Sequence, residues 1–194
     1  PLARVAGPMV SIIINPVSGG ATLDQARLRA QLAASMLEAH GEPGDVTLTM
    51  SRGHARDLAA AAAARGARLV VAWGGDGTMN EVASSLVGQR SVLGLVPAGS
   101  GNGLARELGL PGAPTDALRL ALSCAPRRID AGQLGGRWFF SVAGIGFDAH
   151  VARAFDADAG HARGLRGYVH LTVRELWRYQ CGRYAIDSAP PTSA

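Results

Sequence analysis

Residues 69–78 read Leu-Val-Val-Ala-Trp-Gly-Gly-Asp-Gly-Thr, an apolar run that ends abruptly in a turn with few side chains. The run predicts a buried strand at 69–73, and the residues after the turn predict a helix at 79–87. A strand, a glycine turn and a helix N-terminus in this order form a cradle for an anion. Bare backbone N–H groups approach a phosphate closely, and the helix dipole favours its negative charge. The sequence therefore predicts a phosphate site within an α/β fold.

The first 123 residues alternate predicted strands with predicted helices. The predicted strands lie at 10–15, 46–50, 69–73 and 92–96. The predicted helices lie at 22–40, 53–65, 79–87, 102–108 and 115–123. Repeated units of this kind predict a parallel sheet with helices on both faces, and such sheets bind ligands at the carboxyl ends of their strands. We therefore expect an α/β, Rossmann-like N-terminal domain over residues 1–124.

The pattern changes after Pro126. A helical period extends over 163–179, and residues 183–187 predict a strand. Two antiparallel strands and a turn are predicted at 128–133, 138–143 and 144–147, respectively. So few strands cannot close a β-sandwich or leave its edges protected. We therefore expect residues 125–194 to be the start of a β-rich second domain that is truncated.

The chain contains no lysine, so its formal net charge of +4 is due to arginine. A P-loop protein needs the lysine of Gly-x-x-x-x-Gly-Lys-Ser/Thr, which excludes that class. The basic balance suits nucleotides or a membrane surface. Nucleic acid is not expected, because the arginines are scattered and only 5% of the residues are aromatic.

No apolar stretch reaches the roughly 18 residues of a membrane span and no secretory signal is visible, so we expect a cytoplasmic or peripheral protein.

Two further glycine turns follow predicted strands. They read Asn-Pro-Val-Ser-Gly-Gly at 15–20 and Pro-Ala-Gly-Ser-Gly-Asn-Gly at 97–103. Because parallel strands end at the same edge of a sheet, we expect the three turns to converge on one nucleotide. A dinucleotide fits less well, since residues 99–103 lack the Gly-x-Gly-x-x-Gly spacing and no acidic residue follows the second strand.

Asp76 is a carboxylate inside the predicted phosphate cradle. It repels a phosphate unless a divalent cation or a transferable proton stands between them. This indicates a metal–nucleotide complex and phosphoryl transfer, in which positioning and charge neutralisation supply most of the catalysis. The alternative is that Asp76 caps the helix that follows it.

Five motifs in order resemble the catalytic domain of diacylglycerol kinases, a family that includes bacterial lipid kinases, sphingosine kinases and ceramide kinases. The motifs are Asn15-Pro16-x-Ser18-Gly19, Thr49 with Gly53-His54-Ala55, Gly74-Gly75-Asp76-Gly77-Thr78-x-Asn80-Glu81, Pro97-x-Gly99-Ser100-Gly101-Asn102-x-Leu104-Ala105 and Gly144-x-Gly146-Phe147-Asp148-Ala149. The resemblance covers essentially the whole chain.

The resemblance implies a lipid kinase that uses ATP and Mg²⁺, with an acceptor lipid that enters between two domains at a membrane surface. Asn102 is expected to contact the acceptor, whereas Asp148 either orients it or ends a strand. The protein would be cytoplasmic and peripherally membrane-associated, and it could form a homodimer. The implied nucleotide contacts are Asn15, Pro16, Val17, Ser18, Gly19, Thr49, Gly74, Gly75, Asp76, Gly77, Thr78, Met79, Asn80 and Ser100.

The fourth motif leaves the acceptor open between diacylglycerol and a sphingoid base, because Gly-Ser-Gly-Asn-Gly-Leu-Ala is closer to the sphingosine-kinase sequence. The bacterial branch places its catalytic acid and Mg²⁺ ligands in the second domain, beyond Ala194. In the sphingosine-kinase branch the aspartate of the glycine turn is the base, and we predict this catalytic role for Asp76. An NAD kinase, which shares the Gly-Gly-Asp-Gly turn, and a catalytically inactive nucleotide- or lipid-binding module are the alternatives.

Overall fold

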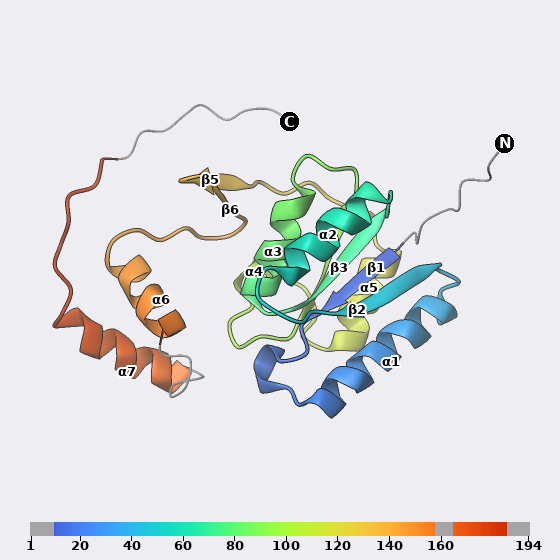
Figure 1. Ribbon diagram of the computed structural model, residues 1–194, viewed down its shortest axis with the longest axis horizontal. Coiled ribbons are helices and arrows are strands. Elements are labelled where there is room, and N and C mark those ends of the chain that lie inside the picture. The colour runs from blue at the N-terminus through green and yellow to red at the C-terminus, as the bar shows by residue number, and fades with distance from the viewer. Residues whose placement is uncertain (1–9, 158–164, 186–194) are drawn as a thin grey trace. The chain divides into compact units, whose positions relative to one another are not determined.

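The computed structural model describes residues 10–157 and 165–185 (Figure 1). Contacts divide the chain into two compact units, residues 1–141 and 142–194, and each is described by itself. Among the described residues, none of the helices has the length and apolar character needed to cross a bilayer.

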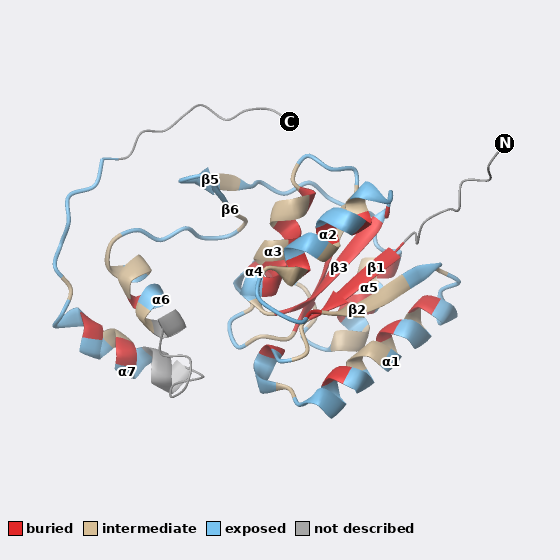
Figure 2. Cartoon of the chain, viewed as in Figure 1, coloured by how far each residue is buried: buried red, intermediate tan, exposed pale blue. Residues whose placement is uncertain are grey.

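A four-stranded parallel sheet with strand order β2-β1-β3-β4 forms the centre of the first unit. Its strands are β1 (Val10–Ile14), β2 (Gly44–Leu48), β3 (Leu69–Gly74) and β4 (Val92–Pro97). The two central strands, β1 and β3, are buried along their whole length (Figure 2). Helices cover both faces of the sheet, which is why β3 is apolar throughout and β1 is apolar except for the buried Ser11.

Side chains alternate between the two faces of the sheet, and each face has its own helices. Ile12 and Trp73 pack in the core under α1 and α5, whereas Ile13 and Ala72 pack in the core under α2, α3 and α4. The helices are α1 (Leu23–Ala39), α2 (His54–Ala64), α3 (Asp76–Leu86), α4 (Gly103–Glu107) and α5 (Pro114–Ser123). The predicted α/β architecture with a parallel sheet is confirmed.

The strand register brings the ends of β1, β3 and β4 together. Ile14 lies opposite Trp73, and Gly74 lies opposite Pro97. The strand order also reverses between β1 and β3, since the chain leaves β1 toward β2 and then returns past it to β3. The carboxyl ends at such a switch point flank a crevice that binds ligands.

Helix α3 begins at Asp76, three residues before the predicted start. Gly75 is extended, with φ −90° and ψ −174°, and its carbonyl accepts a hydrogen bond of 3.0 Å from the Met79 N–H. The predicted turn at 74–78 was therefore too long. Gly77 has a low helix propensity, and packing of α3 on the sheet overrides it.

A short hairpin joins the first unit after α5. Strands β5 (Gly132–Leu134) and β6 (Arg137–Phe139) pair antiparallel, and both residues of the Gly135-Gly136 turn have positive φ. The strands are shorter than predicted. The Asn80 side chain donates a 3.0 Å hydrogen bond to the Trp138 carbonyl, which ties the hairpin to α3. The domain boundary after residue 124 stays a prediction.

The second unit consists of two helices in the residues that the structure describes. They are α6 (Phe147–Ala157) and α7 (Leu165–Leu176). Helix α7 lies within the helical period predicted at 163–179, whereas α6 was not predicted. Residues 142–157 and 165–185 contain no strand, so the β character expected there is confined to the hairpin of the first unit. The strand predicted at 183–187 falls partly outside the described residues, and residues 183–185 are not a strand.

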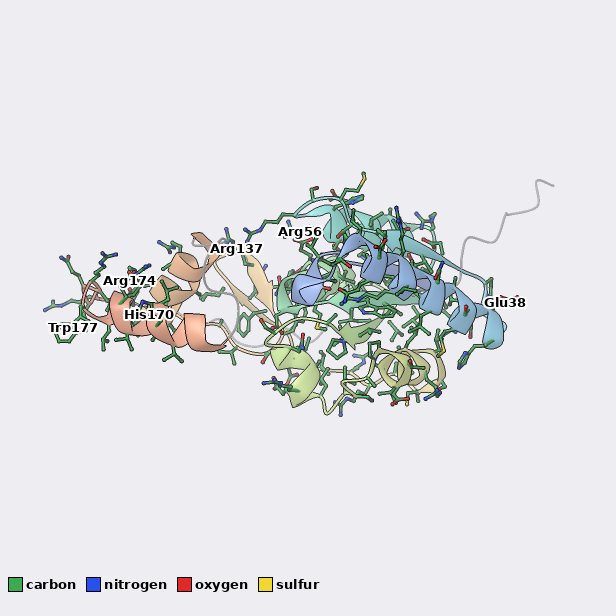
Figure 3. The ribbon with its side chains drawn as sticks, turned by 90° about the horizontal axis from the view of Figure 1, so that it is seen from below. Glu38, Arg56, Arg137, His170, Arg174 and Trp177 are labelled. Atoms are coloured by element: carbon green, nitrogen blue, oxygen red, sulfur yellow. The ribbon has the colours of Figure 1, made fainter. Side chains whose placement is uncertain are left out.

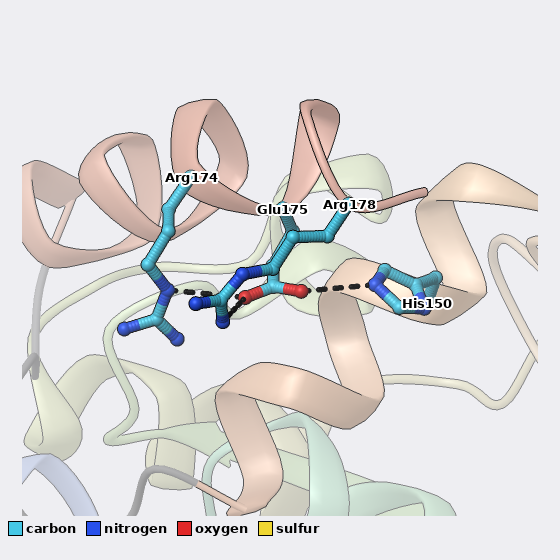
Figure 4. Close-up of polar contacts among 4 residues, drawn as sticks. All are labelled: His150, Arg174, Glu175 and Arg178. Atoms are coloured by element: carbon cyan, nitrogen blue, oxygen red, sulfur yellow. Dashed lines mark hydrogen bonds and ion pairs between the residues drawn. The ribbon is translucent and has the colours of Figure 1, made fainter. Parts of the chain in front are cut away.

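A buried carboxylate connects α6 to α7 (Figure 4). Glu175, only 6% exposed, lies 3.0 Å from the His150 Nε2 atom of α6. It also accepts a 3.0 Å hydrogen bond from the Arg174 Nε atom, and the Arg178 Nη1 atom lies 3.6 Å away. The hydrogen bond with His150 is the largest of the contacts that lower the pKa of Glu175. Trp177, by contrast, is 88% exposed at the outside of this unit (Figure 3).

Acid should loosen the packing of α6 on α7. The lowered pKa of Glu175 means that the folded unit binds fewer protons than the unfolded chain just below the ordinary carboxyl range. The stabilisation is therefore complete above the ordinary pKa and is lost as the pH falls through the lowered value. Hydrogen exchange of the α6 and α7 amides, corrected for intrinsic rates, should show this loss of protection.

Glu175→Gln should lower the same protection at neutral pH and remove its dependence on acid. Glu38→Gln is the control, because Glu38 is exposed on α1 (Figure 3). Equal protection in the Glu175 variant and the parent chain at neutral pH would contradict this account.

Candidate functional site

The three glycine turns contact one another through their backbones. A Cβ atom on Gly19 would lie 2.5 Å from the Ala98 carbonyl oxygen, which sets the first turn against the third. A Cβ atom on Gly99 would lie 2.6 Å from the Gly75 Cα atom, which sets the third turn against the second. No side chain fits in either place, so these glycines are required by the approach of the turns. The predicted convergence of the three turns is confirmed.

Asn15 joins the first turn to helix α3. Its Nδ2 atom donates a 2.9 Å hydrogen bond to the Thr78 hydroxyl, and its Oδ1 atom accepts a 3.1 Å bond from the Val17 N–H. The Ser18 hydroxyl donates to the Asn15 carbonyl at 2.9 Å. Together these bonds fix the first turn and the first helical turn of α3 as one rigid edge.

Arg29 of α1 also holds the first turn, although it belongs to none of the sequence motifs. Its Nη1 atom donates to the Ser18 hydroxyl at 3.0 Å and to the Ser18 carbonyl at 3.3 Å, and Nη2 reaches the same carbonyl at 3.3 Å. Partial burial lowers the pKa of its guanidinium. Arg29 lies three residues after the buried Ala26 and four before the buried Ala33, so the helical period places it at the edge of the inward face, whereas Arg27 lies on the other side of α1. This period was the signal in the sequence, but only the fold shows that Arg29 reaches Ser18.

The N-terminus of α3 has no side-chain cap. The first N–H groups of a helix lack intrahelical partners, and those of α3 begin at Asp76 and Gly77, both exposed. Nothing lies within 4 Å of the place where a Gly77 Cβ atom would be, so the space beside this backbone is open. Uncapped N–H groups, the helix dipole and open space suit an anion.

Asp76 does not cap α3, contrary to the alternative considered from the sequence. Its Oδ2 atom accepts a 2.8 Å hydrogen bond from the Asn102 N–H and so joins the second turn to the third. A Cβ atom on Gly101 would lie 2.8 Å from the same oxygen. Within the described residues Oδ1 accepts no hydrogen bond, and it remains available for chemistry.

The Asn102 side chain closes its own turn. Its φ is +55°, its Oδ1 atom accepts from the Gly99 N–H at 2.8 Å, and its Nδ2 atom donates to the Gly99 carbonyl at 2.8 Å. Both ends of the carboxamide are thus engaged in the turn, and contact of Asn102 with an acceptor stays a prediction. The neighbouring Ser100 is exposed at the tip of the turn.

Thr49 lies beside the first turn, where its N–H donates to the Ile14 carbonyl at 2.9 Å. His54 of the second motif and Glu81 of the third motif hold the loop that follows Thr49. Glu81 accepts a 3.0 Å bond from the Gly53 N–H, and the His54 Nδ1 atom accepts a 3.0 Å bond from the Met50 N–H. Glu81 and His54 therefore have structural roles here, and Thr49 is positioned at the site by its backbone.

Three other predicted site residues have side chains that are engaged elsewhere in the chain. The Met79 side chain is 1% exposed in the core, and the Asn80 carboxamide bonds the hairpin, so both side chains are used for packing. Their nucleotide contacts stay predictions. Asp148 belongs to the second unit, where it lies in the first turn of α6 against Gly144. Its role with the acceptor also stays a prediction.

The described residues contain no protein-built metal cage. Within 10–157 and 165–185, no three His, Cys, Asp or Glu side chains come together as a metal-binding group. Mg²⁺ often binds through one or two carboxylates, substrate phosphates and water, and Asp76 at the open edge fits this donor set.

Comparison with known proteins identifies the family of a chain with these three turns. The family model of the diacylglycerol kinase catalytic domain matches residues 9–134, which contain all three turns. The chain belongs to this family.

Relatives of the diacylglycerol kinase catalytic domain are found among curated proteins and solved structures. The chain is 38% identical over 139 residues to a probable YegS-like lipid kinase of Chromohalobacter salexigens, covering 70% of this chain and 45% of that protein. A similar protein of Pseudomonas putida is 38% identical over 145 residues, covering 74% and 49%. A diacylglycerol kinase structure from Bacillus anthracis matches with a TM-score of 0.60 at 26% identity, covering 68% and 48%. The chain spans about half the length of these relatives.

Gly99→Ala should separate the second and third turns. The new Cβ atom would lie 2.6 Å from the Gly75 Cα atom and 2.9 Å from the Asn102 Oδ1 atom, so the backbone must move. We expect a loss of about 1–3 kcal/mol in the free energy of unfolding, measured in urea. Gly112→Ala is the control, because nothing lies within 4 Å of its Cβ position. A loss in Gly99→Ala no larger than in this control would contradict close packing of the turns.

Proposed function

We propose that this chain carries the ATP-binding half of a lipid kinase, which transfers the γ-phosphate of ATP to a hydroxyl of diacylglycerol or a related lipid. The observation that carries the proposal is the convergence of three glycine turns beside the uncapped N-terminus of α3. Membership of the diacylglycerol kinase catalytic domain family and relatives named lipid kinases support the lipid as acceptor.

The phosphates of ATP would lie over the first turn and the N-terminus of α3. The N–H groups of Asp76, Gly77 and Thr78 would donate to the phosphate oxygens, because these groups begin the helix without a cap. Gly19 and Ser100 would complete the cradle from the neighbouring turns. Mg²⁺ would neutralise phosphate charge and separate it from the Asp76 carboxylate.

Asp76 is the proposed general base. Its Oδ2 atom is fixed by the Asn102 N–H at 2.8 Å, which leaves Oδ1 to take the proton of the acceptor hydroxyl. The hydroxyl oxygen then forms a bond to the γ-phosphorus, the bond from that phosphorus to the bridging oxygen breaks, and ADP leaves. The proton stays on Asp76 until it passes to water.

A cavity beside the third turn has a mixed lining, which suits an acceptor with an apolar chain and a polar headgroup. It measures about 410 Å³ and opens next to α4, which follows the third turn directly. Its apolar lining is Leu104, Leu108, Ile129, Phe139 and Phe140, and its polar lining is Glu107, Arg127, Arg128, Asp130 and Ser141. We propose that this cavity receives part of the lipid at a membrane surface, with the protein cytoplasmic and peripherally bound. The proposed acceptor is diacylglycerol or a sphingoid base. We also propose that the protein forms a homodimer.

Transfer of radiolabel from γ-labelled ATP to a mixed lipid extract tests the function. We expect a labelled lipid that depends on Mg²⁺ and none when lipid is omitted. Labelling of added NAD instead would favour an NAD kinase. ATP binding with no labelled lipid would overturn the kinase proposal for this chain and leave a nucleotide-binding module.

Asp76→Asn should abolish transfer without weakening the binding of ATP. An asparagine oxygen can still accept from the Asn102 N–H, so the turns stay joined, but the amide cannot take a proton. We expect initial rates of labelling to fall about 10²- to 10⁴-fold. Asp116→Asn on α5, whose carboxylate pairs with Arg119 at 2.6 Å, is the control and should transfer normally. Unchanged turnover in Asp76→Asn would exclude the base assignment.

A further inference from the structure

The Arg29 guanidinium holds the first glycine turn through uncharged oxygens, unlike the arginines of the first unit that pair with carboxylates. Arg27, Arg68 and Arg119 each pair with a carboxylate. Arg29 contacts uncharged oxygens of Ser18 and forms no ion pair within residues 10–157 and 165–185. Its charge is therefore not neutralised locally, although it is half-buried beside the first glycine turn.

The contact with Ser18 fixes the direction of one peptide group. Both terminal nitrogens of Arg29 donate to the Ser18 carbonyl at 3.3 Å each, and the Ala21 N–H, just before α1, donates to it at 3.4 Å, so this carbonyl points toward α1. The peptide between Ser18 and Gly19 is trans, because the described chain has no cis bonds. In a trans peptide the C=O and N–H groups point in opposite directions. The Gly19 N–H therefore points away from α1.

The Gly19 N–H is suited to a ligand. It makes no hydrogen bond to the described part of the chain, whereas the N–H groups of Ser18 and Gly20 bond the Asn15 and Val17 carbonyls. The same glycine, with φ +67°, lies against the Ala98 carbonyl where the first and third turns meet. An unpaired N–H at the junction of two turns is available to an anion, as in other backbone anion sites.

We propose that Arg29 is a positioning residue of the phosphate site, which fixes the Ser18–Gly19 peptide so that the Gly19 N–H faces the phosphates of the nucleotide. Its positive charge, left without a carboxylate partner, favours the same anion from behind the turn. In a chain without lysine, this arginine supplies both geometry and charge. The inference rests on the proposed nucleotide function and adds a residue outside the five motifs.

The test compares ATP with adenosine, which lacks phosphates. Affinity for ATP is measured by isothermal titration calorimetry and affinity for adenosine by ligand-observed NMR. We expect Arg29→Gln to weaken ATP at least about tenfold, since charge-assisted hydrogen bonds are roughly twice as strong as neutral ones. Adenosine affinity and the midpoint of thermal unfolding should stay close to those of the parent chain.

Two further variants complete the experiment. Arg27→Gln lies on the same helix, and its side chain pairs with Asp24 at 3.2 Å on the surface, so it should bind ATP as the parent does. Arg29→Lys keeps the charge, but a single ammonium group cannot reproduce the contacts of the two terminal guanidinium nitrogens with Ser18. We therefore expect an ATP affinity between those of the parent and Arg29→Gln.

Each outcome decides for or against the inference. An Arg29→Gln chain that binds ATP as tightly as the parent overturns it, and so does an equal loss for ATP and adenosine, which would indicate a merely structural role. If Arg29→Gln does not fold, Arg29→Lys is decisive: a loss for ATP alone supports the inference, and no loss overturns it. A parent chain that binds no ATP overturns the proposed function itself and this inference with it.

Discussion

The close approach of three backbone turns is the constraint on which the rest of the site depends. The strand register places the ends of β1, β3 and β4 at one edge, but only residues without side chains let the following turns touch. Gly19 lies against Ala98, and Gly99 lies against Gly75, in space that a Cβ atom would occupy. The contact creates an edge where N–H groups of several turns are exposed together, and in the proposed function this edge would hold the phosphates of the nucleotide without a lysine.

Polar side chains then hold the turns in fixed relation. Asn15 bridges the first turn to Thr78 of α3, and Asp76 bridges α3 to the third turn. Arg29 supports the first turn from behind, so that a positive and a negative side chain bracket the proposed phosphate site. The carboxylate therefore has two functions: it joins two turns through one oxygen and presents the other to solvent. Such a division would let Asp76 hold the turns together and also act as the proposed base.

The sequence predicted the sheet, its helices and the meeting of the turns, because apolar runs and glycines carry these features locally. It did not predict that α3 begins at Asp76, since Gly77 lowers helix propensity and only packing on the sheet overcomes this. It also missed α6, whose Gly144 and Gly146 indicated a turn between strands. In both places the glycines predicted a turn between elements, whereas in the structure a helix begins at or directly after them.

From the sequence alone, the order of strands and glycine turns determined an α/β fold and predicted a phosphate site at one edge, and the absence of lysine excluded a P-loop. Only the tertiary structure decided what individual polar side chains do. Asn80 and Asn102 belong to motifs that predict a nucleotide site, yet their carboxamides bond the hairpin and the third turn. Arg29 belongs to no motif, yet it orients the first turn. For Asn80 and Arg29 the physical reason is that their hydrogen-bond partners lie on other segments, whose proximity is set by the fold. For Asn102 the reason is local, since a φ of +55° lets its carboxamide reach Gly99 within the same turn.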